Sequence, residues 1–116
     1  MNRKIATTKV AGVTYEGRQA HIARMTMQTP VRIVPEPTNK YDPNALAVHA
    51  AIAPGEVLQV GYIPRDLAAI LAPKLDGEAV MARVKEITGG FQMEYGPEEG
   101  EYANLGLLLE VEYPDA

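Results

Sequence analysis

The richest stretch of the sequence for binding chemistry is residues 36–48, Glu-Pro-Thr-Asn-Lys-Tyr-Asp-Pro-Asn-Ala-Leu-Ala-Val. Asn39 and Asp42 can hydrogen-bond to nearby backbone and so stiffen a tight loop. A rigid loop that carries Asn39, Lys40 and Tyr41 can also hydrogen-bond to a nucleobase and stack on it. The pattern therefore predicts either a purely structural turn or a platform for a nucleobase.

A second segment, residues 60–69, reads Val-Gly-Tyr-Ile-Pro-Arg-Asp-Leu-Ala-Ala. It predicts a strand that runs through Tyr62 into a helix beginning at Pro64. First-turn N–H groups lack partners within a helix and attract phosphate or carboxylate, and Arg65 adds charge and up to five donors there. The alternative interpretation is that Tyr62 packs on the core and Arg65 extends into solvent.

A third segment, residues 10–18, places Tyr15 at the end of another expected strand, close to a basic residue. Tyr15, Tyr41 and Tyr62 thus all lie at junctions between strands and loops. Such positions favour a ring whose apolar body is packed while its hydroxyl or its face stays accessible.

An enzymatic site would have to be built without cysteine or serine, because the chain contains neither. Their absence excludes thiolate and serine nucleophiles, disulfides and cysteine-based metal sites. His21 and His49 lie far apart in the sequence, and no phosphate-loop or zinc-protease motif occurs. The acidic tract of residues 94–101 could offer oxygens to Mg²⁺ or Ca²⁺, but it lacks calcium-loop spacing and suits a solvated hairpin tip better. We therefore expect no catalytic residue, no cofactor and no metal.

Charge is unevenly distributed along the chain, although the formal net charge is only −4. Residues 1–75 carry nine basic and five acidic groups, whereas residues 76–116 carry two basic and ten acidic groups. This indicates either ordinary solvation of two surfaces or a basic face able to hold an anion, with an acidic remainder that limits non-specific adhesion.

The elements that must position these residues are mostly short runs in which apolar and polar residues alternate, as in half-buried strands. The expected strands are residues 4–15, 21–28, 31–34, 46–52, 57–63, 80–87 and 105–113. In the last of these, one face carries the apolar residues Leu105, Leu107, Leu109, Val111 and Tyr113, and Glu110 and Glu112 face water. Leu67, Ile70, Leu71 and Leu75 have helical spacing, and the expected helix ends near residue 72 because Pro73 disrupts it. We therefore predict a single domain over residues 1–116, mainly β, forming a small OB-like barrel of six or seven strands with one short capping helix near residues 64–76.

Taken together, the three segments resemble the HIRAN domain, first described in DNA-repair translocases. The resemblance rests on three ordered motifs within residues 8–76: Val-Ala-Gly-Val-Thr-Tyr, Glu-Pro-x-Asn-x-Tyr-Asp-Pro-Asn-Ala-x-Ala-Val and Val-Gly-Tyr-Ile-Pro-Arg-x-Leu-Ala. It implies an OB-like barrel with a helical cap that binds DNA, in known members a single-stranded 3′ end. Residues 77–116 fit the family only as further β runs.

The resemblance also implies roles for individual residues. In known members the aromatic residue after the first motif's glycine stacks on a base, which matches Tyr15. The Asn-x-Tyr-Asp loop supports the terminal nucleotide, which matches Asn39, Tyr41 and Asp42.

A basic residue at the start of the helix contacts phosphate in the family, which matches Arg65, with Tyr62 beside it. A further aromatic from the C-terminal part contributes, and the candidates here are Phe91, Tyr95 and Tyr102. Two positions depart from the family pattern. Lys40 replaces the usual proline, which loosens the loop and adds a cation, and Thr14 stands where a basic residue can occur.

We therefore hypothesise a small, stand-alone, non-enzymatic module that captures single-stranded DNA at a 3′ end and serves a DNA-processing or repair protein. The alternative is a protein–protein adaptor that uses the same barrel, with the acidic residues 94–112 as its contact surface. No apolar run approaches the roughly 20 residues that span a bilayer, and no leader opens the chain. We accordingly expect a cytoplasmic protein without a membrane partner.

Overall fold

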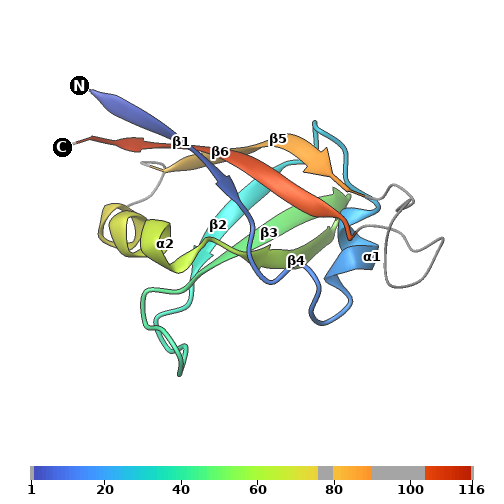
Figure 1. Ribbon diagram of the computed structural model, residues 1–116, viewed down its shortest axis with the longest axis horizontal. Coiled ribbons are helices and arrows are strands. Elements are labelled where there is room, and N and C mark those ends of the chain that lie inside the picture. Colours follow the sequence, from blue (N-terminus) through green and yellow to red (C-terminus); the bar gives the residue numbers. More distant parts are fainter. Residues whose placement is uncertain (1, 76–79, 90–103, 116) are drawn as a thin grey trace, which may run out of the picture.

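The computed structural model describes residues 2–75, 80–89 and 104–115 (Figure 1). Its elements are β1 (Arg3–Lys9), α1 (Arg18–Ile22), β2 (Val31–Pro35), β3 (Leu46–Ala53), β4 (Glu56–Tyr62), α2 (Arg65–Leu71), the 3₁₀ helix η1 (Ala72–Lys74), β5 (Met81–Thr88) and β6 (Gly106–Pro114). The acidic tract of residues 94–101 and the aromatic candidates Phe91, Tyr95 and Tyr102 lie outside the described residues. The domain is mainly β, as predicted.

The six described strands form two antiparallel sheets of three strands each. In the first sheet, with the order β1-β6-β5, β6 is central because both neighbours pair with it. In the second sheet, with the order β2-β3-β4, the central strand is β3. Leu107, Leu109, Val111 and Tyr113 alternate along β6 and are buried, which confirms the face predicted for this strand.

The two sheets meet where the chain leaves β1. The Val10 amide donates to the Leu107 carbonyl at 2.9 Å, and Ala11 then exchanges two backbone hydrogen bonds with Tyr62. Along the opposite margin β2 and β5 approach each other, but within the described residues no ladder joins them. The described strands are therefore two bridged sheets, and the closed OB-like barrel is not found in them.

The sheet junction depends on a close backbone approach at Gly61. A Cβ atom at this position would lie 2.5 Å from the Ala11 carbonyl oxygen and would also collide with the Val10 side chain. Only glycine lets β4 come this near to the segment that follows β1. This junction holds Tyr62 next to the loop that carries Tyr15.

The expected strand over residues 21–28 is wrong, because this segment begins within α1 and continues in turns. The Ala23 amide donates to the Gln19 carbonyl, and the Met25 amide donates to the Ile22 carbonyl, both at 3.0 Å. Ile22 and Met25 are both buried at a helical spacing of three residues. The alternation of apolar and polar residues in this segment reflects the sequence composition and does not reflect strand pairing.

The expected strand over residues 4–15 is too long, since β1 ends at Lys9. The chain turns at Gly12, whose φ of 71° lies in the left-handed region that glycine adopts without strain. The prediction for α2 is confirmed, because the helix ends at Leu71 and a 3₁₀ turn containing Pro73 follows. None of the helices in the described ranges is long and apolar enough to cross a membrane.

Candidate nucleic-acid interface

Residues 10–18 and 36–48 each contain a loop, and residues 60–69 contain the junction of β4 and α2. The loop between β2 and β3 and the loop between β1 and α1 both project below the sheets in Figure 1. The junction of β4 and α2 contacts each of them. Ala11 pairs with Tyr62, and Arg65 forms an ion pair with Asp42.

Asn39 stiffens the β2–β3 loop with its side chain. Its Oδ1 accepts hydrogen bonds from the backbone N–H groups of Tyr41 at 2.9 Å and Asp42 at 3.1 Å. Its Nδ2 donates to Glu36 Oε1 at 3.0 Å, while Asp42 Oδ1 accepts from the Asn44 amide at 2.9 Å. The side-chain oxygens of Asn39 and Asp42 thus hold the loop, as the structural interpretation of this motif predicted.

The rigid loop presents Tyr41 and Lys40 to solvent, and Arg65 of α2 lies against it. Tyr41 is 89% exposed, and Lys40 beside it is also exposed. Arg65 Nε lies 3.4 Å from Asp42 Oδ2, and its Nη2 donates to the Tyr41 carbonyl at 3.2 Å. Because the Arg65 side chain remains 76% exposed, its guanidinium is held at the Tyr41 backbone and at Asp42 without being covered.

Tyr62 connects the loops and presents its ring less openly than Tyr41 does. The Tyr62 hydroxyl donates to Glu36 Oε1 at 2.9 Å, the same oxygen that accepts from Asn39. Its ring is half-buried, and the Arg18 guanidinium carbon lies 5.4 Å from the ring centroid. Tyr62 therefore joins β4 to the β2–β3 loop through Glu36.

Tyr15 is the second open ring and lies on the turn before α1. It is 67% exposed, its amide donates to the Gly12 carbonyl at 3.4 Å, and its own carbonyl accepts from the Arg18 amide at 3.0 Å. A Cβ atom at Gly12 would lie 3.9 Å from Cδ2 of Tyr15 and 3.9 Å from Cδ2 of Tyr62. The Tyr15 and Tyr62 rings are thus neighbours, which connects this turn to the other two loops.

Sequence reasoning missed two residues of this arrangement, Glu36 and Arg18. Glu36 opens the second motif, but nothing local indicates that its carboxylate will accept from Tyr62, which is 26 positions away. Arg18 is the sole charged residue in the described ranges that is buried, with 6% exposure. The signal that could have found Arg18 is its position shortly after Gly12 and Tyr15, in a segment that must turn.

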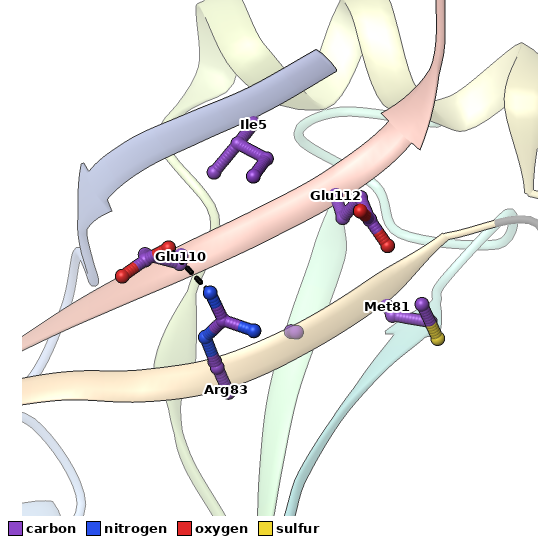
Figure 2. A pocket seen from close by; sticks show the side chains of 6 residues that line it. Ile5, Met81, Arg83, Glu110 and Glu112 are labelled. Carbon is purple, nitrogen blue, oxygen red and sulfur yellow. Dashed lines mark hydrogen bonds and ion pairs between the residues drawn. The ribbon is translucent and has the colours of Figure 1, made fainter. Parts of the chain in front are cut away.

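A pocket elsewhere on the domain does not share these properties. It lies on the outer face of the β1-β6-β5 sheet, between Ile5, Met81 and Glu112, where Arg83 donates to Glu110 at 2.8 Å (Figure 2). None of the predicted site residues lines it. Over residues 2–75, 80–89 and 104–115 there is no group of three or more acidic or imidazole side chains that could hold a metal ion.

The fold and the loops define a small two-sheet β domain that presents aromatic and basic side chains from three joined loops. The sequence model of the HIRAN domain matches residues 6–90, which is most of the chain, and the protein belongs to the HIRAN domain family. HIRAN domains are generally associated with DNA binding. No curated protein and no solved structure matches the chain.

Proposed function

We propose that this protein binds single-stranded DNA at a 3′ end and acts as a binding module without catalytic activity of its own. Family membership supports DNA binding in general. The observation that carries the finer proposal is the exposure of Tyr41 and Tyr15 on loops that hydrogen bonds fix in place, with Arg65 held beside Tyr41. Open rings on a rigid support lose little conformational freedom when a base stacks on them.

Stacking sets the scale of the expected affinity. Each base that stacks on an aromatic side chain contributes about 1–3 kcal/mol, so two tyrosines contribute about 2–6 kcal/mol. Lys40 and Arg65 add phosphate contacts whose strength depends on salt. A dissociation constant of 1 μM corresponds to about 8 kcal/mol, and we therefore expect micromolar or weaker binding of a short strand.

Asp42 is the residue that we assign to the preference for a strand with a free 3′-hydroxyl. A free 3′-hydroxyl is a hydrogen-bond donor that a carboxylate accepts, whereas a 3′-phosphate brings a second negative charge to the same place. Asp42 is only 20% exposed, and both of its oxygens already have a partner within the loop. Each carboxylate oxygen can nevertheless accept a second hydrogen bond, so Asp42 can hold the terminal hydroxyl while it keeps Arg65 in place.

The predicted site residues then divide into two roles. Tyr15, Tyr41, Lys40 and Arg65 are exposed and are assigned to contacts with DNA. Asn39 and Tyr62 use their polar atoms within the protein and are assigned to holding the loops in position. Asp42 is assigned both roles, because it pairs with Arg65 and can also accept from the terminal hydroxyl.

The test is a titration of short single strands that differ only at the 3′ terminus. We expect a strand with a 3′-hydroxyl to bind more tightly than the same strand with a 3′-phosphate. Asp42→Asn removes the repulsion and should bring the two affinities together. Equal affinity of the unmodified protein for both strands would refute capture of the 3′ end, and no binding of either strand would refute the DNA-binding function.

A further inference from the structure

Arg18 is a buried cation close to Tyr15 and Tyr62, two of the predicted site residues. Only 6% of its surface is exposed, its Nη1 donates to the Gly12 carbonyl at 2.8 Å, and its guanidinium lies over the Tyr62 ring. A carbonyl dipole and a ring face stabilise a cation, but a buried charge also requires an anionic partner.

Glu16, whose side chain lies on the protein surface, is this anionic partner. Arg18 Nη2 donates to Glu16 Oε2 at 3.1 Å, yet the Glu16 side chain is 79% exposed. Its backbone has a φ of 54°, a left-handed conformation that is uncommon for a residue other than glycine. The carboxylate therefore covers the guanidinium without being packed, and it can move into water while the rest of the turn stays in place.

A phosphate group has the chemistry to take the place of this carboxylate. Guanidinium groups bind carboxylates and phosphates through the same N–H···O geometry, and both pairs are charge-assisted. The position is also suitable, because a Cβ atom at Gly12 would lie 3.0 Å from Arg18 Nη1 and 3.9 Å from the Tyr15 ring. A nucleotide whose base stacks on Tyr15 thus brings its phosphate close to the Arg18 guanidinium.

We propose that Arg18 forms a phosphate-binding subsite, which the Glu16 carboxylate occupies in the free protein and a DNA phosphate occupies in the complex. This deepens the proposed function and rests on it, since it assigns a phosphate contact next to the base stacked on Tyr15. Glu16 keeps its charge when it moves out, so it competes with DNA and lowers the affinity.

The first test compares Glu16→Gln with Glu86→Gln in titrations of a short single strand at fixed salt. Both substitutions remove one negative charge, but Glu86 is an exposed residue of β5, in the β1-β6-β5 sheet, and does not contact Arg18. We expect Glu16→Gln to bind the strand roughly two- to fivefold more tightly than Glu86→Gln, the range of an exposed charge–charge interaction. Equal affinities of the two variants would overturn the subsite.

A second test uses inorganic phosphate as the probe and follows the Arg18 side-chain Nε–Hε resonance by NMR. Phosphate should shift this resonance at lower concentration in Glu16→Gln than in Glu86→Gln. If Tyr41→Ala weakens DNA binding while the two Gln variants respond alike to both probes, the proposed function stands and the subsite is refuted. If no strand binds, the phosphate titration still tests the subsite. An Arg18 shift that saturates at a lower phosphate concentration in Glu16→Gln than in Glu86→Gln supports it, and equal concentrations refute it.

Discussion

Replacing Tyr41 with alanine tests the proposed DNA-binding loop directly, because this exposed side chain is assigned to DNA and contributes little to the fold. The ring is 89% exposed, and the hydrogen bonds of Tyr41 to the protein use its backbone. Its amide donates to Asn39, and its carbonyl accepts from Arg65. Alanine keeps both of these bonds, so we expect the loop and the position of Arg65 to survive the substitution.

The expected loss of affinity follows from the stacking energy. Loss of the ring on which one base stacks costs about 1–3 kcal/mol of binding free energy. The dissociation constant should therefore rise roughly 5- to 150-fold. The free energy of unfolding should change by no more than about 0.5 kcal/mol, as for other exposed substitutions. The loss should therefore appear in binding and not in stability.

The assay is fluorescence anisotropy of a labelled single strand of about ten nucleotides at fixed salt, with thermal unfolding measured on the same samples. Tyr41→Phe is the matched control, since it retains the ring and should bind within about twofold of the unmodified protein. An alanine variant that binds as tightly as the unmodified protein, with an unchanged melting temperature, would refute stacking on Tyr41. Combining it with Arg65→Ala separates DNA binding from the adaptor alternative, in which neither residue matters for oligonucleotides.

Three further predictions concern the cation, the sheet junction and pH. Arg65→Gln should lower the slope of log affinity against log salt by about 0.7, the value for one phosphate contact to a single strand; an unchanged slope would exclude that contact. Gly61→Ala should lower the free energy of unfolding by about 1–3 kcal/mol, because its Cβ collides with Val10; denaturant unfolding checks this, and unaltered stability would contradict the close approach. The hydrogen bond from Arg24 lowers the pKa of Glu56, so this pair stabilises the fold above the ordinary glutamate pKa of about 4.3 and loses its effect as pH falls through the lower folded value. The melting temperatures of Glu56→Gln and the unmodified protein should therefore differ at pH 7 and converge in acid, and a constant difference would count against the pair.

The features that the sequence determined by itself are local. The Asn and Asp side chains of residues 39–44 act on amides two or three positions away, so their turn chemistry is visible in the motif. Alternation predicted the buried face of β6, and Pro73 predicted where α2 ends. In each case the partners lie within a few residues, and spacing along the chain is enough to identify them.

Other features depended on contacts that leave no pattern along the chain. Residues 21–28 alternate like a strand, yet packing of Ile22 and Met25 against the core makes the first part helical. The hydrogen bond of Tyr62 to Glu36 and the burial of Arg18 beside the Tyr62 ring were equally invisible. Only the tertiary structure decided which tyrosines stay open and which one connects the loops, because burial and long-range hydrogen bonds are set by the meeting of the two sheets and not by neighbours in the sequence.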